Sequence, residues 1–149
     1  MLLNPFCYLI LIWALDMSSP CYCKNLRDFT RKMTAIYDAE LDAYGINIAQ
    51  YSLMRLVINN NPVSLTRLGD IAGLDRSTVG RNVTVLARQG WLQVDRDGMD
   101  KRQQQVSITP EGEALIREAF PSWQRCQHII EERLGADNVM ALQNIFHQI

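Results

Sequence analysis

The sequence predicts a mainly α-helical fold with one small β-hairpin, and three observations support this. Apolar residues recur at helical spacing through most of the chain. Residues 64–90 have the pattern of two short helices joined by a tight turn. Two extended runs, residues 91–96 and 103–108, flank a polar tip, which is typical of a hairpin. With 149 residues, 48% of them hydrophobic, the chain is long and apolar enough for one domain with a real core.

The two short helices have clear ends and clear buried faces. Gly73 is expected to end the first helix because glycine readily adopts the positive φ of a helix C-terminus. Either Asp75 or Ser77 can cap the second helix. Apolar residues share one face of each helix: Leu68, Ile71 and Ala72 in the first, and Val79, Val83 and Leu86 in the second.

The opposite face of the second helix predicts contact with DNA. Residues 76–89 contain three arginines and no acidic residue. Guanidinium groups bind guanine bidentately, asparagine reads adenine, and hydroxyls reach phosphates or base edges. The alternative is an ordinary helical hairpin with solvated arginines. The candidate DNA-binding residues of this helix are Arg76, Ser77, Thr78, Arg81, Asn82 and Arg88.

The hairpin that follows makes the pattern more specific. Its tip, residues 97–102, carries Lys101 and Arg102, and Arg96 lies just before the tip. Residues 109–111, Thr-Pro-Glu, then predict a new helix, with the hydroxyl as N-cap and proline at the first helical position. A helix-turn-helix followed directly by a hairpin with a basic tip is the pattern of a winged helix.

With these motifs the chain resembles the MarR family of bacterial transcription factors, and the resemblance extends from about residue 21 to the C-terminus. Where the family's wing usually has arginine, this chain has Met99, which leaves Lys101 and Arg102 as candidates for minor-groove or phosphate contact. The resemblance implies a homodimer that binds a pseudo-palindromic operator in double-stranded DNA. Four segments carry it: Leu74–Val79, Gln89–Leu92, Asp97–Arg102 and Ser107–Gly112.

The chain is expected to contain one such domain, residues 17–149, after an apolar extension, residues 1–16. The ten uncharged residues 6–15 are too short to span a bilayer, and no basic residue precedes them as in a secretory signal. We interpret Met17 as the native start of translation, with a membrane tether as the alternative. N-terminal sequencing of the native protein distinguishes the two.

The domain is expected to divide into a winged-helix core, about residues 47–109, and helices at both ends. The end helices, about residues 20–45 and 110–149, carry long apolar stripes that a compact monomer would leave uncovered. In the resembled family such helices form a dimerisation layer. We further expect a bend at Pro121 and a last helix capped by Asp137.

Four cysteines bear on the compartment and on sensing: Cys7, Cys21, Cys23 and Cys126. Their spacing fits neither a secreted disulfide framework nor a zinc site, so we expect a reducing, cytoplasmic location and no metal or cofactor. The predicted first helix resembles that of the organic hydroperoxide resistance regulators. This likeness implies Cys23 as the reactive thiol, Tyr37 as its hydrogen-bond partner and Cys126 as a partner thiol.

The physical chemistry of a helix start permits such a thiol switch. Unsatisfied N–H groups there stabilise a thiolate, with Lys24 and Arg27 adding positive charge. The alternative is that Cys23 and Cys126 simply pack on apolar stripes. A small aromatic or phenolic ligand, bound between the helical layer and the winged core, is a rival signal.

No enzyme motif is found: the sequence has no glycine-rich phosphate loop, no HExxH and no GxSxG. The net charge of −1 excludes a protein that coats nucleic acid. The sequence therefore predicts a sequence-specific, dimeric DNA-binding transcriptional regulator. We expect a repressor relieved by a small-molecule or oxidant signal, the latter in a stress response. The alternative is a winged-helix protein-interaction module without base reading, for which an aromatic or leucine anchor would be expected.

Overall fold

The structure, a computed structural model, describes residues 20–96 and 104–146. The apolar extension and the hairpin tip with Lys101 and Arg102 lie outside the described residues. The chain divides into two units, residues 1–33 and residues 34–149. None of the described helices is long and apolar enough to cross a membrane.

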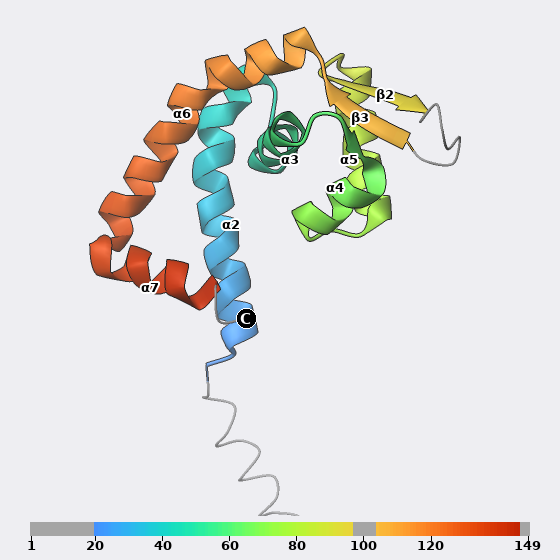
Figure 1. Ribbon diagram of the computed structural model, residues 1–149. Helices are drawn as coiled ribbons and strands as arrows, with labels where there is room; N and C mark the ends of the chain where they lie inside the picture. The colour runs from blue at the N-terminus through green and yellow to red at the C-terminus, as the bar shows by residue number, and fades with distance from the viewer. Residues whose placement is uncertain (1–19, 97–103, 147–149) are drawn as a thin grey trace, which may run out of the picture. The chain divides into compact units, whose positions relative to one another are not determined.

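Helices dominate both units, and a small sheet completes the second, which confirms the predicted fold class (Figure 1). The sheet is antiparallel in the order β1-β3-β2. The elements are α2 (Tyr22–Leu41), η1 (Asp42–Tyr44), α3 (Ile48–Asn59), β1 (Val63–Ser64), α4 (Leu65–Ala72), α5 (Arg76–Arg88), β2 (Leu92–Arg96), β3 (Gln104–Ile108), α6 (Pro110–Leu134) and α7 (Ala136–Phe146).

The hairpin forms where the sequence predicts it, and the structure adds a strand. β2 and β3 pair with Leu92 opposite Ile108 and Arg96 opposite Gln104. The two-residue strand β1 pairs with the other edge of β3, with Val63 opposite Val106. Sequence analysis missed β1 because two residues carry no detectable alternation. β1 leads directly into α4, so the pairing of β1 with β3 fixes the start of the helix-turn-helix against the sheet.

Capping groups set the helix ends largely as predicted. Gly73, at φ 62°, ends α4. The side chain of Asp75 accepts a hydrogen bond from the backbone N–H of Thr78 at 2.9 Å, so Asp75 and not Ser77 caps α5. Asp137 is a correction: α7 already begins at Ala136, so Asp137 lies inside the first turn and is not its cap. A carboxylate in the first turn still favours the helix by interacting with its dipole.

The core of the second unit gathers around α3, which contacts α4, β3 and α6 (Figure 1). Tyr51 and Met54 of α3 are buried, and the Tyr51 ring stacks on Trp123 of α6 with centroids 6.1 Å apart. The predicted apolar stripe of α5 is fully inside, since Val79, Val83 and Leu86 are all buried. Burying one face of α5 in this way turns its other face to solvent.

Within the second unit, a row of polar bonds holds the end of α2 and η1 against α6. Tyr37 donates to Gln127 at 3.0 Å, and Arg125 donates to Glu40 at 3.1 Å. The hydroxyls of Tyr44 and Ser122 share a hydrogen bond of 3.1 Å. These bonds satisfy polar groups that packing would otherwise leave unpaired, and they fix the register of the two helices. α6 is continuous through Pro121 and curves in Figure 1.

Candidate nucleic-acid interface

The outer face of α5 is a cationic surface. Arg76, Arg81 and Arg88 are exposed, and none of them forms an ion pair within the part of the chain that the structure describes. Ser77 is exposed, and Thr78 and Asn82 are half-buried. Arg96 is the last residue of β2, so it belongs to the hairpin next to this face. Unpaired, solvated guanidinium groups are available to an anionic partner.

Asp75 organises the N-terminal end of this face. Its carboxylate accepts hydrogen bonds from the Ser77 hydroxyl at 2.5 Å and from the Thr78 hydroxyl at 2.7 Å. Arg81 in turn donates from Nη2 to the Thr78 hydroxyl at 3.1 Å. A chain of bonds therefore runs from the guanidinium of Arg81 through Thr78 to the Asp75 carboxylate. The hydrogen bonds that Asp75 accepts, first from the Ser77 hydroxyl and then from the hydroxyl and backbone N–H of Thr78, hold the pKa of Asp75 well below its usual range.

Acid titration is expected to remove the contribution of Asp75 to stability. Because its pKa is lower in the folded chain, this contribution is fully present above the unfolded carboxyl's pKa of about 3.9 and is lost as the pH falls through the folded value. Asp75→Asn keeps an N-cap acceptor but cannot ionise. The difference in melting temperature between the wild type and this variant should shrink from pH 6 to pH 3, as followed by circular dichroism. A difference in melting temperature that stays constant over this pH range would contradict a stabilising role of the ionised Asp75 carboxylate.

Asn82 and Val85 modify the predicted face. The amide of Asn82 donates to the backbone carbonyl of Thr78 at 3.2 Å, so part of its donor capacity is used within α5. Val85 is 42% exposed between the predicted polar positions, so the face is not purely polar as the sequence analysis expected. An exposed valine can contact a thymine methyl group or a sugar.

Two grooves border the face. The first, of about 570 Å³, lies between α5 and the sheet, with Arg81, Thr84 and Arg88 on one side and Val94 of β2 on the other. The second, of about 440 Å³, lies beside α4 and is lined by Arg67 and Arg76. Leu65 and Gln104 line both grooves, so the two grooves meet at these residues. Sequence analysis missed Arg67 and Gln104, because only the fold brings α4 and β3 to this surface.

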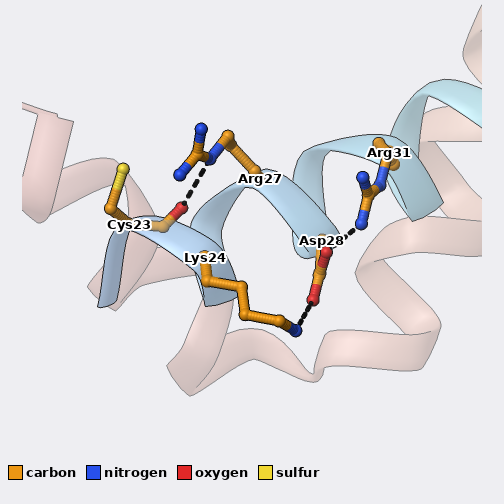
Figure 2. Close-up of polar contacts among 5 residues, drawn as sticks. All are labelled: Cys23, Lys24, Arg27, Asp28 and Arg31. Atoms are coloured by element: carbon orange, nitrogen blue, oxygen red, sulfur yellow. Dashed lines mark hydrogen bonds and ion pairs between the residues drawn. The ribbon is translucent and has the colours of Figure 1, made fainter. Parts of the chain in front are cut away.

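The start of α2, in the first unit, presents the candidate sensing cysteine. Cys23 lies in the first helical turn, as the sequence predicts, and it is exposed (Figure 2). Arg27 donates to the backbone carbonyl of Cys23 at 3.4 Å. Lys24, however, forms an ion pair of 2.7 Å with Asp28, which also pairs with Arg31. Lys24, one of the two cations expected to support the thiolate, therefore has a carboxylate partner that it shares with Arg31.

The other two residues of the predicted switch have partners of their own in the second unit. The hydroxyl of Tyr37, the hydrogen-bond partner of Cys23 that the resemblance implied, donates to Gln127 within the second unit. Cys126 is fully buried and its thiol donates to the backbone carbonyl of Ile36 at 3.6 Å. Burial, and then the charge of Glu40, raise the pKa of Cys126. Cys126 therefore packs among buried side chains within this chain, and its role as a partner thiol stays a prediction.

Arg55 of α3 lies among aromatic side chains of α3 and α6. The half-buried guanidinium of Arg55 is stacked among three aromatic rings, with centroids 5.9 Å away for Tyr51, 5.7 Å for Phe120 and 5.5 Å for Trp123. It borders a groove of about 380 Å³ that Arg117 and Glu113 also line. Within the described residues, neither arginine forms an ion pair. No sequence pattern pointed to this cluster.

The helix-turn-helix of α4 and α5, followed by the β2–β3 hairpin, defines a winged helix-turn-helix protein. A model of the MarR family matches residues 44–103, the winged-helix part of the chain. The transcriptional regulator HosA of Escherichia coli is 25% identical over 125 residues, covering 84% of this chain and 88% of HosA.

Solved structures of transcriptional regulators are similar to this chain. The transcriptional regulator MosR of M. tuberculosis, solved in complex with DNA, is 25% identical with a TM-score of 0.76, covering 87% of this chain and 95% of that one. BpsR of Bordetella bronchiseptica, whose DNA binding is regulated by 6-hydroxynicotinic acid, is 21% identical with a TM-score of 0.79, covering 88% and 94% of the two chains.

Proposed function

We propose that the chain is a sequence-specific DNA-binding transcriptional regulator that acts as a dimer in the cytoplasm. The observation that carries the proposal is the exposed side of α5 next to a hairpin, with three guanidinium groups that form no ion pair with any residue the structure describes. That arrangement suits a recognition helix in the major groove of DNA. The complex of MosR with DNA supports the same use of this fold.

The DNA backbone would follow the two grooves beside α5. α5 enters the major groove with Arg81 toward a guanine edge, while Arg88 and Arg67 meet phosphates in the flanking grooves. Arg96, Lys101 and Arg102 of the hairpin then meet the adjacent minor groove or its phosphates. Because phosphate contacts release counterions, affinity should fall steeply with salt.

Binding to the DNA upstream of the chain's own gene tests this function. Fluorescence anisotropy with that DNA, in parallel with a scrambled duplex of the same length, should show tighter binding to the former. Equal and weak binding to both would contradict the proposal. It would favour the alternative, a protein-interaction module that uses the same helix face.

Exposed apolar side chains on the end helices support dimerisation. In the first unit, Tyr22 and Leu26 of α2 are 77% and 56% exposed. In the second unit, Met140 and Ile145 of α7 are also exposed. A second copy of the chain would remove these side chains from water, and its two-fold symmetry would place two α5 helices about one turn of DNA apart.

Charges on these apolar positions should therefore separate the subunits. Leu26→Glu and Met140→Glu are each expected to shift the molar mass in multi-angle light scattering from two chains toward one, because each places a carboxylate in an apolar contact. Thr30→Glu, on an exposed polar position of α2, is the matched control. A wild type that elutes as a single chain would contradict the dimer.

The signal that we propose for release of DNA is a small aromatic acid bound near Arg55, with oxidation of Cys23 as the second candidate. An anionic ligand would give Arg55 and Arg117 the charge partner that the described residues do not supply. Regulation of BpsR by 6-hydroxynicotinic acid supports the chemical class. The exposure of Cys23 in the first turn of α2 supports the second candidate.

One pair of variants separates the two signals. If the ligand acts at Arg55, 6-hydroxynicotinic acid should release DNA from the wild type and from Cys23→Ser, but not from Arg55→Met, which keeps the apolar stem. If oxidation acts, dilute peroxide should release DNA from the wild type and not from Cys23→Ser. Mass spectrometry that finds Cys23 unmodified at low peroxide removes the oxidant signal.

A further inference from the structure

We propose that Asp75 determines base specificity at the N-terminal end of α5, because it fixes the direction in which two neighbouring hydroxyl groups donate. The proposal rests on the DNA-binding function proposed above and specifies which base edges that site accepts. It favours a base whose major-groove edge donates a hydrogen bond, cytosine or adenine, beside the base that Arg81 contacts.

The argument starts from the number of protons available. An ionised carboxylate can only accept hydrogen bonds, and a hydroxyl has one proton to give. Ser77 gives its proton to Oδ1 of Asp75 at 2.5 Å, and Thr78 gives its proton to Oδ2 at 2.7 Å. Neither hydroxyl therefore has a proton left for DNA. Their remaining lone pairs, together with those of the exposed carboxylate, make this end of α5 a hydrogen-bond acceptor.

The neighbouring guanidinium has the opposite character. Arg81 can only donate, and its bond to the Thr78 hydroxyl at 3.1 Å uses a lone pair of that oxygen. Ser77 and Arg81 both line the first groove, the one between α5 and the sheet. A base step in contact with this end of α5 would thus meet an acceptor at Ser77 and Asp75 next to a donor at Arg81.

Base edges in the major groove match this pattern selectively. Cytosine N4 and adenine N6 donate there, whereas guanine O6 and N7 and thymine O4 only accept. The carboxylate of Asp75 also repels a phosphate, so this end of α5 is poorly suited to a contact with the DNA backbone. The acceptor therefore contributes to base selection and weakens sequence-independent binding.

Asp75→Asn reverses the pattern at Thr78 without removing the helix cap. The asparagine oxygen, in the place of Oδ1, can still accept from the backbone N–H of Thr78 and from the Ser77 hydroxyl, whereas the amide nitrogen, in the place of Oδ2, now donates to the Thr78 hydroxyl. The proton of Thr78 then turns outward. The matched control is Asp70→Asn, which removes a carboxylate from the wall of the second groove; the side chain of Asp70 makes no hydrogen bond within the described residues.

Selection from a duplex pool with randomised half-sites, followed by anisotropy titrations with all four bases at the selected positions, tests the proposal. The wild type should prefer cytosine or adenine by about tenfold at one position next to a guanine. Asp75→Asn should lose that preference and bind scrambled DNA more tightly, with circular dichroism confirming its fold. Asp70→Asn should bind scrambled DNA more tightly yet keep the wild-type preference.

The outcomes separate the two proposals. If the wild type selects a site and Asp75→Asn keeps the same preference, the role of Asp75 is overturned while DNA binding stands. The same holds if Asp70→Asn loses the preference equally, because charge alone would then explain it. If the wild type selects no sequence at all, the DNA-binding function itself fails.

Discussion

Arg81→Ala is expected to weaken binding to the preferred operator by about 1–3 kcal/mol per site and to relax the sequence preference at one position of each half-site. Arg81 is exposed on the outer face of α5, and its only bond within the described residues is to the Thr78 hydroxyl. Its truncation therefore leaves the core intact and removes a bidentate donor from the DNA face. Anisotropy titrations with the operator and with single-base variants measure both effects.

Arg67→Ala is the matched control for this prediction. It removes the same charge from the same surface, but from the wall of the second groove, where a phosphate contact is expected. It should weaken binding to all sequences alike and lower the salt dependence of the affinity, as Lys101→Ala should on the hairpin. If Arg81→Ala also weakens every sequence equally, Arg81 reads no base.

Gly112→Ala is expected to destabilise the fold by about 3 kcal/mol. A methyl group on this buried glycine would collide with the backbone carbonyl of Trp91 and lie 2.9 Å from Cδ1 of Ile108. The carbonyl cannot move away easily, because it accepts a hydrogen bond from the backbone N–H of Thr109 at 3.2 Å. The same contact joins the base of the hairpin to the start of α6, so repulsion there disturbs both elements.

Urea unfolding followed by circular dichroism measures this effect, and Gly80→Ala is its control. A methyl group on Gly80 would meet only Cδ2 of Leu65, at an ordinary 3.9 Å. Since alanine is the better helix former, this change inside α5 should stabilise the fold by up to about 1 kcal/mol. If the two substitutions have equal effects on the unfolding midpoint, close packing at Gly112 is not what makes it intolerant.

Local patterns predicted the elements well wherever one or two turns of chain carry the whole signal. α3 begins with a capping box, a motif of two residues three positions apart, in which the Asn47 and Gln50 side chains accept from each other's backbone N–H groups at 2.9 and 3.0 Å. Gly73 takes the expected positive φ, and Thr109 caps α6. In each case the side chain and its partner lie within three or four residues, so the sequence itself specifies their geometry.

The candidate site was predicted less completely because its parts come from separate elements. The arginines of α5 stood out because residues 76–89 hold three of them and no acidic residue. Arg67 and Gln104 did not, since β1 and β3 must pair before α4 and the hairpin meet beside α5. The sequence offered Asp75 as one of two N-cap candidates, beside Ser77, and it did not predict the two hydroxyl bonds, which depend on side-chain rotamers.

By itself the sequence determined the helices, their ends, the hairpin and a cationic α5, because periodicity and capping act over one or two helical turns. Only the tertiary structure decided which groups meet across the fold: the aromatic rings around Arg55, the burial of Cys126 and the partner of Tyr37. The physical reason is that such contacts join residues about seventy to ninety positions apart, as Tyr37 and Gln127 show. Their free energy comes from packing and desolvation, which no local pattern of the chain records.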